Sequence, residues 1–100
     1  IIDEAREIDP SLPAAPARLI VDDSAKGPAY AVASDAQKAF IIDVARASGL
    51  LFDPVYTGKA LFAVREAAAR GELDGKRVLF IHTGGLPGLL AQADDFRGFV

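Results

Sequence analysis

Cysteine is absent from this 100-residue chain, and the one histidine is His82. Without cysteine there is no disulfide, thiolate nucleophile or cysteine metal ligand, as is typical of proteins from a reducing compartment. With no second histidine and no cluster of carboxylates beside His82, we expect no metal site. We expect His82 itself to be a hydrogen-bonded structural residue and not a catalytic base.

The chain also lacks clustered positive charge and long hydrophobic runs. Its 11 Lys and Arg residues are scattered and its net charge is −3, whereas nucleic-acid binding requires grouped cations that neutralise phosphate. No apolar run approaches the ~20 residues of a membrane-spanning helix, and no signal peptide is visible. We therefore expect no nucleic-acid partner, no membrane partner and a cytoplasmic location.

Apolar residues, in contrast, are plentiful, at 51% of the chain. A chain this short buries a smaller share of its surface than a large domain does. We therefore expect part of its apolar surface to contact protein outside this sequence. Its first residue is Ile1, as if a helix were already under way, so we expect residues 1–100 to be one fragment without an internal domain boundary.

Helices are predicted in four places. Residues 1–8 end at a proline-marked turn, and Pro10, Pro13 and Pro16 then make an extended connector. Ser34 is a good N-cap for a helix at about 34–48, which Gly49 ends. The other two are an apolar stripe from Ala60 to Ala68 that stops at Gly71, and a short helix near 86–93.

Strands are predicted at 18–22 and 77–82, where short runs of β-branched and apolar residues suit a buried parallel strand. The element order is helix, strand, helix, helix, strand, helix. This order favours an α/β fold in which helices flank a parallel sheet.

The segment 82–89 (HTGGLPGL) follows the second predicted strand. In open parallel sheets ligands bind beyond the carboxyl ends of strands, and paired glycines before a helix can form an anion cradle. The plain alternative is a tight turn that needs glycine only for its backbone conformation. The motif alone favours the turn, because short glycine motifs often match by chance.

Tyr56 lies in the segment 53–60 (DPVYTGKA), after a proline and before Gly58. At the mouth of a sheet its phenol can act as an acid or base or orient a substrate. An isolated tyrosine is more often a residue at the edge of the core.

Together and in this order, the segments 53–60 and 82–89 resemble the D-cysteine desulfhydrase and 1-aminocyclopropane-1-carboxylate deaminase family. This family is a branch of the tryptophan-synthase-β-like, fold-type-II enzymes that use pyridoxal 5′-phosphate. The resemblance covers roughly residues 18–90. It implies that the chain is the C-terminal part of such an enzyme, which is a homodimer acting on a small amino acid.

The resemblance assigns roles to several residues. Thr83, with Gly84 beside it, corresponds to the threonine at the pyridine nitrogen of the cofactor, where a hydroxyl can donate to an unprotonated nitrogen. Tyr56 and Tyr30 correspond to two tyrosines beside the substrate. Thr57 corresponds to another position next to the cofactor nitrogen.

Thr57 also separates the branches of the family. The deaminases carry glutamate at this position and HLGG where this chain has HTGG at 82–85. The resemblance therefore implies a D-cysteine desulfhydrase, which converts D-cysteine to pyruvate, ammonia and hydrogen sulfide by α,β-elimination. The alternatives are a 1-aminocyclopropane-1-carboxylate deaminase, a lyase acting on a sulfonated amino acid, and a non-catalytic α/β interaction module.

Lys59 lies inside the segment 53–60, but we do not assign it as the lysine that forms a Schiff base with the cofactor. In the family that lysine lies far upstream, and a lysine at this motif position is structural. We therefore expect the full-length protein to be an active carbon–sulfur lyase and the 100-residue fragment alone to be inactive.

Overall fold

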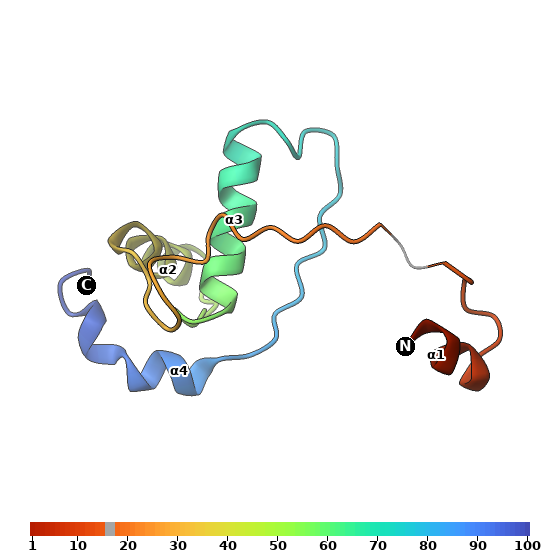
Figure 1. Ribbon diagram of the computed structural model, residues 1–100. Helices are drawn as coiled ribbons and strands as arrows, with labels where there is room; N and C mark the ends of the chain where they lie inside the picture. Colours follow the sequence, from red (N-terminus) through yellow and green to blue (C-terminus); the bar gives the residue numbers. More distant parts are fainter. Residues whose placement is uncertain (16–17) are drawn as a thin grey trace.

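The computed structural model describes residues 1–15 and 18–100, and its regular structure is helical (Figure 1). Pro16, one of the prolines expected in the connector, lies outside the described residues. In chain order the elements are α1 (Ile2–Ile8), α2 (Asp35–Ser48), α3 (Thr57–Ala69), α4 (Leu86–Ala91) and the 3₁₀ helix η1 (Ala93–Phe96). The four predicted helices are thus confirmed, although α4 ends two residues early.

The capping residues at its two ends determine where α2 begins and stops. The Ser34 hydroxyl accepts a hydrogen bond from the Gln37 N–H at 3.2 Å, and the Gln37 side chain accepts one from the Ser34 N–H at 2.9 Å. This reciprocal pair satisfies two backbone donors that a helix start leaves free. At the other end Gly49 adopts a φ of 74° and donates to the Ala45 carbonyl. The left-handed conformation is one that glycine adopts without strain.

The two expected strands require correction. Segments 18–22 and 77–82 are not strands, and the described residues hold only an isolated bridge between Ala29 and Val32. A strand needs a neighbour that completes its ladder of hydrogen bonds, and neither segment is paired with another among residues 1–15 and 18–100. The expected parallel sheet is therefore absent from the described part of the chain.

The core lies between α2, α3 and the C-terminal segment. Ile41, Phe52 and Phe96 are buried together. Beside them Phe40 of α2 and Phe62 of α3 meet edge to face, with 5.5 Å between ring centroids. This contact geometry is favourable for aromatic pairs.

The crossing of α2 and α3 depends on Gly58. A Cβ at this position would lie 2.5 Å from both the Asp53 carbonyl oxygen and the Ile41 Cδ1. The first is a backbone atom and the second belongs to a buried side chain, so neither can move freely into solvent. Glycine is therefore required for the start of α3 to approach α2.

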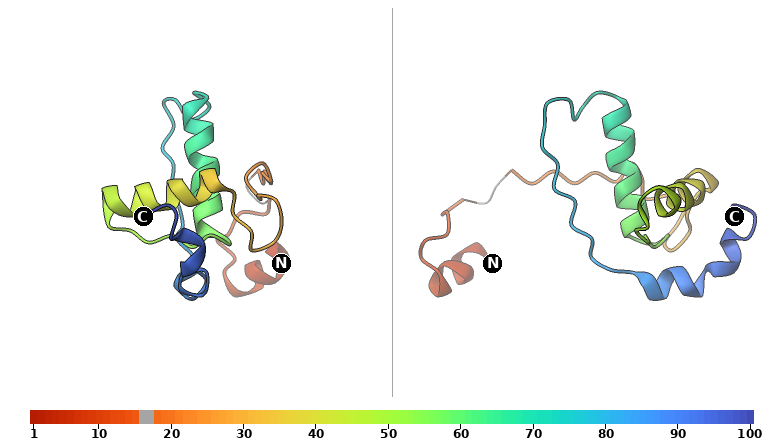
Figure 2. Two further views of the ribbon diagram at one scale, coloured as in Figure 1. Left: turned by 90° about the vertical axis from the view of Figure 1, so that its left-hand side faces the viewer. Right: turned by 180° about the vertical axis from the view of Figure 1, so that it is seen from behind.

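Much of the molecule is open to solvent. The accessible surface is 7440 Å² for a mass of 10.5 kDa, whereas a compact monomer of this mass exposes about 5,400 Å². The radius of gyration is 16.7 Å, against about 13 Å for a compact 100-residue domain. Figure 2 shows the cause, because α1 lies away from the other helices and long extended segments join the elements. The excess surface is comparable to that of a protein–protein interface.

Gly58→Ala should lower the melting temperature of the full-length protein, because the added methyl group overpacks the contact between α2 and α3. The expected loss is about 1–3 kcal/mol of stability, measured by thermal or denaturant unfolding. Gly98→Ala is the matched control, since no atom lies within 4 Å of a Cβ there. Equal stability of the two variants would contradict the packing role of Gly58.

Candidate functional site

The Asp53 carboxylate organises the start of α3. Although the side chain is only 2% exposed, it accepts hydrogen bonds from the backbone N–H groups of Val55, Tyr56 and Thr57 at 2.7–2.8 Å. The Thr57 hydroxyl donates to it as well. These N–H groups have no partner within the helix, so an aspartate placed just before Pro54 is suited to cap them. The cap fixes the backbone that carries Tyr56 and Thr57.

Opposing effects act on the pKa of Asp53. Burial raises it, but the hydrogen bonds from the Thr57 side chain and from the three N–H groups together outweigh burial, so the pKa lies below the ordinary value of 3.8. A lowered pKa in the folded state means that the ionised carboxylate stabilises the fold at neutral pH. This contribution is complete above about pH 3.8 and is lost as the pH falls through the folded-state pKa.

The two conspicuous motifs of the sequence meet at Asp53. The Thr57 hydroxyl lies 3.4 Å from the Gly84 carbonyl oxygen. A Cβ on Gly85 would overlap the Asp53 side chain, and Gly85 has a φ of 109°. Glycine is therefore needed at Gly85 both for its conformation and for its close approach to the carboxylate.

His82 holds the other side of the glycine turn. Its Nδ1 accepts a hydrogen bond from the Gly84 N–H at 3.1 Å. The proton is therefore on Nε2, which donates to the Leu51 carbonyl at 2.9 Å. The ring also lies against Phe52, with 4.7 Å between centroids. Both nitrogens are engaged, in agreement with the structural role expected for His82.

Thr83 is exposed, and its hydroxyl has no partner among the described residues. The backbone on either side of it is held, by His82 before and by Gly84 and Gly85 after. Gly84 has a φ of 101°, which supports the tight-turn interpretation of the glycine pair. The result is a free hydroxyl on a fixed segment.

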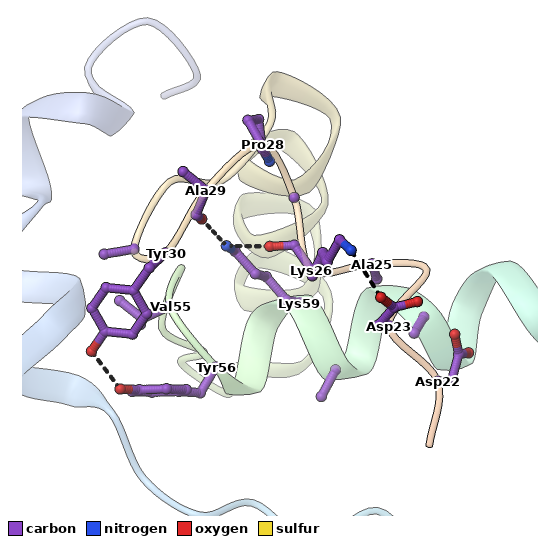
Figure 3. Close-up of a pocket in the computed structure, with 14 residues that line it drawn as sticks. Asp22, Asp23, Ala25, Lys26, Pro28, Ala29, Tyr30, Val55, Tyr56 and Lys59 are labelled. Atoms are coloured by element: carbon purple, nitrogen blue, oxygen red, sulfur yellow. Dashed lines mark hydrogen bonds and ion pairs between the residues drawn. The ribbon is translucent and has the colours of Figure 1, made fainter. Parts of the chain in front are cut away.

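Tyr30 and Tyr56 lie together. Their hydroxyl oxygens are 2.6 Å apart, and their rings meet edge to face with 6.2 Å between centroids (Figure 3). The hydrogen bond with Tyr30 is the main effect that raises the pKa of Tyr56, with smaller contributions from desolvation and from the nearby charges of Tyr30 and Asp53. The Tyr56 phenol is therefore protonated at neutral pH and can donate a hydrogen bond.

The tyrosine pair faces a depression of about 600 Å³ between the loop 22–31 and the start of α3. Lys59 also lines it, but its ammonium is already engaged with the carbonyl oxygens of Lys26 at 2.7 Å and Ala29 at 3.2 Å. Burial lowers the pKa of Lys59, and the negative charge of Asp53 opposes this effect. The expected structural role of Lys59 agrees with these bonds.

The structure thus brings the predicted site residues together in two pairs. Tyr30 and Tyr56 share the depression, while Thr57 and Gly84 meet beside Asp53. Thr83 does not line the depression. The two pairs are adjacent because Tyr56 and Thr57 are consecutive residues.

Two residues that build the site were not singled out from the sequence. Asp53 accepts several hydrogen bonds at the start of α3. The order Asp53, Pro54 and then Thr57 three residues later is typical of a capped helix start and could have indicated this role. Gln37 is buried, and its side-chain N–H₂ donates to the Ala25 carbonyl at 2.7 Å. Nothing in the sequence near Gln37 pointed to the loop that it binds.

Neither a metal cluster nor a membrane helix is seen in the described part of the chain. Among residues 1–15 and 18–100, no three His, Cys, Asp or Glu side chains are grouped to hold a metal ion. None of the helices described there has the length and hydrophobicity needed to cross a membrane.

The chain is similar to enzymes with known names. It is 37% identical over 94 residues to the 1-aminocyclopropane-1-carboxylate deaminase of Burkholderia ambifaria, a match that covers 93% of this chain and 28% of the relative. With the deaminase of Burkholderia vietnamiensis it shares 40% identity over 86 residues, covering 85% of this chain and 25% of the relative. The bifunctional D-cysteine desulfhydrase/1-aminocyclopropane-1-carboxylate deaminase, mitochondrial, of Arabidopsis thaliana is 38% identical over 79 residues, covering 77% of this chain and 20% of the relative.

The chain belongs to the 1-aminocyclopropane-1-carboxylate deaminase and D-cysteine desulfhydrase family. It matches a C-terminal fragment of that family and spans about a quarter of the length of these relatives. No family model and no solved structure matches it.

Asp53→Asn should destabilise the full-length protein at neutral pH by about 1–3 kcal/mol, because an amide replaces a charged acceptor of several N–H groups. The difference between parent and variant should be constant above about pH 4 and should shrink as the pH falls below 3.8, the ordinary value for aspartate. Thermal unfolding between pH 2.5 and 7 measures it. Asp74→Asn in an exposed turn is the control, and a difference independent of pH would contradict the role of the Asp53 charge.

Proposed function

We propose that the full-length protein is a pyridoxal-phosphate-dependent D-cysteine desulfhydrase, a carbon–sulfur lyase in which this chain provides one wall of the active site. The observation that carries the proposal is the pair of hydroxyls of Tyr30 and Tyr56, 2.6 Å apart beside a depression. The reaction is D-cysteine plus water to pyruvate, ammonia and hydrogen sulfide. The 100-residue chain alone should not catalyse it.

The chemistry of the side chains fits one edge of pyridoxal phosphate. Thr83 offers a free hydroxyl on a held segment, as a partner of an unprotonated pyridine nitrogen requires. Gly84 would border the same edge, whereas the predicted contact of Thr57 is indirect, because Thr57 is 3% exposed, donates its hydroxyl to Asp53 and supports Gly84 from behind. We assign the phosphate loop and the Schiff-base lysine to the remainder of the protein.

The lysines of this chain support that assignment. Lys26 pairs with Asp23, and Lys38 pairs with Asp35. The ammonium of Lys59 is bound by two backbone carbonyls, and that of Lys76 by the Glu72 carbonyl. All four therefore have structural partners.

When bound, pyridoxal phosphate supplies the electron sink that makes the Cα proton of an amino acid acidic. Tyr56, protonated at neutral pH, would orient the substrate carboxylate or donate a proton toward the departing sulfur. Tyr30 holds the Tyr56 hydroxyl in place. Thr83 would keep the ring nitrogen hydrogen-bonded without protonating it.

The second candidate is a 1-aminocyclopropane-1-carboxylate deaminase, because this activity appears in the names of all three relatives described above. Thr57 argues against it, since the deaminases resembled by the chain have glutamate there. The full-length protein should release sulfide and pyruvate from D-cysteine and little ammonia from 1-aminocyclopropane-1-carboxylate. The reverse preference would favour the deaminase. Release of sulfite from a sulfonated amino acid would favour the lyase that acts on such substrates. Inactivity on all of these substrates would favour the non-catalytic interaction module.

The surface of the chain supports its place in a larger fold. Leu19 and Val21 are 87% and 85% exposed in one extended segment, and Leu79 is 87% exposed in the other. We propose that both segments pair with strands of the remaining protein to form the parallel sheet of a fold-type-II enzyme. The homodimer and the cytoplasmic location stay predictions.

Tyr56→Phe in the full-length protein keeps the ring and deletes the hydroxyl. We expect kcat/KM for D-cysteine to fall about 10²-fold or more, because a proton donor is lost from the substrate site. The melting temperature and the absorbance of bound pyridoxal phosphate serve as controls and should stay near those of the parent, since a lost hydroxyl costs about 1 kcal/mol. Parental kcat/KM would reduce Tyr56 to a packing residue.

Thr83 can be tested with two matched substitutions. Thr83→Val keeps the shape and removes the hydroxyl, so it should shift the absorbance spectrum of the bound cofactor and slow elimination about tenfold or more. Thr83→Ser keeps the hydroxyl and should behave like the parent. If both variants retain the parental spectrum and rate, Thr83 does not contact the pyridine ring.

A further inference from the structure

The loop that carries Tyr30 is held by its carbonyl oxygens. Lys59 donates to the carbonyls of Lys26 and Ala29, and Gln37 donates to that of Ala25. Gln92 donates to the Ala31 carbonyl at 3.1 Å. The donors therefore come from α2, α3 and the end of α4, so three elements far apart in sequence fix one loop.

Lys59 is the donor closest to the tyrosine pair. The Ala29 carbonyl that it binds belongs to the peptide unit directly before Tyr30. Tyr56 directly precedes α3 and Lys59 lies in its first turn, and both side chains line the depression. Figure 3 shows the consequence, because the start of α3 reaches the loop twice, at the backbone through Lys59 and at the Tyr30 hydroxyl through Tyr56.

The loop needs external support on the other side of Tyr30 as well. Ala31 has a φ of 58°, a left-handed conformation that costs energy in a residue with a Cβ. Around the Lys59 ammonium the packing is tight, since a Cβ on Gly27 would lie 3.1 Å from the Lys59 Nζ and 2.8 Å from the Val32 carbonyl oxygen. Lys59 itself is 7% exposed, so water is a poor substitute for its hydrogen bonds.

We propose that Lys59 is a positioning residue for Tyr30, whose ammonium fixes the peptide before Tyr30 and thereby holds the Tyr30 hydroxyl against that of Tyr56. The inference rests on the proposed function, in which this hydroxyl pair serves the substrate. Lys59 borders the depression, but its ammonium is bound to two backbone carbonyls, so we place its effect on Tyr30 and not on the substrate. Its removal should therefore matter only while Tyr30 has a hydroxyl to position.

The test is a double-mutant cycle on the full-length enzyme with Lys59→Met, Tyr30→Phe and the double variant. Lys59→Met keeps the length of the side chain and removes the ammonium. In the parent background Lys59→Met should lower kcat/KM for D-cysteine about tenfold. In the Tyr30→Phe background the same substitution should lower kcat/KM less than about twofold. Lys76→Met is the matched control, because the Lys76 ammonium also binds a backbone carbonyl but in an exposed turn. That control should keep kcat/KM within about twofold of the parent.

A second readout does not depend on activity. In protein labelled with ¹³C-tyrosine, the ring resonance of Tyr56, assigned by its loss in Tyr56→Phe, should move in the same direction in Lys59→Met and in Tyr30→Phe. Equal effects of Lys59→Met in both backgrounds, or an unmoved Tyr56 resonance, would overturn the positioning role.

Failure of the proposed function looks different from failure of this inference. If Tyr30→Phe and Tyr56→Phe keep parental kcat/KM, the function fails, and the Tyr56 resonance alone decides whether Lys59 positions Tyr30. If Lys59→Met does not fold, Lys59→Gln replaces it in the cycle, since it removes the charge and is too short to keep both hydrogen bonds of the ammonium. Additive effects of Lys59→Gln and Tyr30→Phe would then overturn the inference.

Discussion

The arrangement of this chain depends on one buried carboxylate, that of Asp53. Taking a charge out of water is unfavourable unless hydrogen bonds replace its hydration, and here three backbone N–H groups and a hydroxyl do so. The dependence runs in both directions, because the start of α3 would leave those N–H groups without partners if the carboxylate were missing. Gly85 adds a steric condition, since only a residue without a side chain can lie against Asp53. One side chain therefore fixes both the start of a helix and the glycine turn that reaches it.

This constraint explains how hydroxyls on two distant parts of the sequence become neighbours. The cap holds the backbone of Tyr56 and Thr57, and Thr57 then contacts Gly84 on the inner side. Tyr56 leaves the same turn on the outer side, where it meets Tyr30. The buried half of the turn is thus structural, and the exposed half is available for chemistry. A rigid, buried support of this kind holds the exposed hydroxyls in fixed positions and so pre-organises the site without burying it.

The sequence predicted the elements whose signals are local. The helix at 34–48 has its N-cap and its terminal glycine within 16 residues, and both act as expected. The segments 18–22 and 77–82 were read as strands from composition, but strand formation depends on a neighbour, which a local pattern does not contain. For the same reason the hydroxyl contact of Tyr30 with Tyr56 did not follow from spacing. The bonds from Lys59 and Gln37 to the loop link residues 12 to 33 positions apart, so only the fold could reveal them.

In the function proposed above, the exposure of the tyrosine pair determines what the rest of the protein would have to contribute. Tyr30 and Tyr56 are 78% and 59% exposed, and hydrogen bonds to solvent-facing groups are weakened by competition with water. Elimination from an amino acid also needs a site from which water is excluded, so that charges act at low dielectric and intermediates are not lost to hydrolysis. In the proposed enzyme this chain would supply the positions of the hydroxyls, and its large open surface leaves the enclosure to the remaining protein. We infer that the remaining protein has two tasks here, to pair with the segments that expose Leu19 and Leu79 and to cover the tyrosine pair.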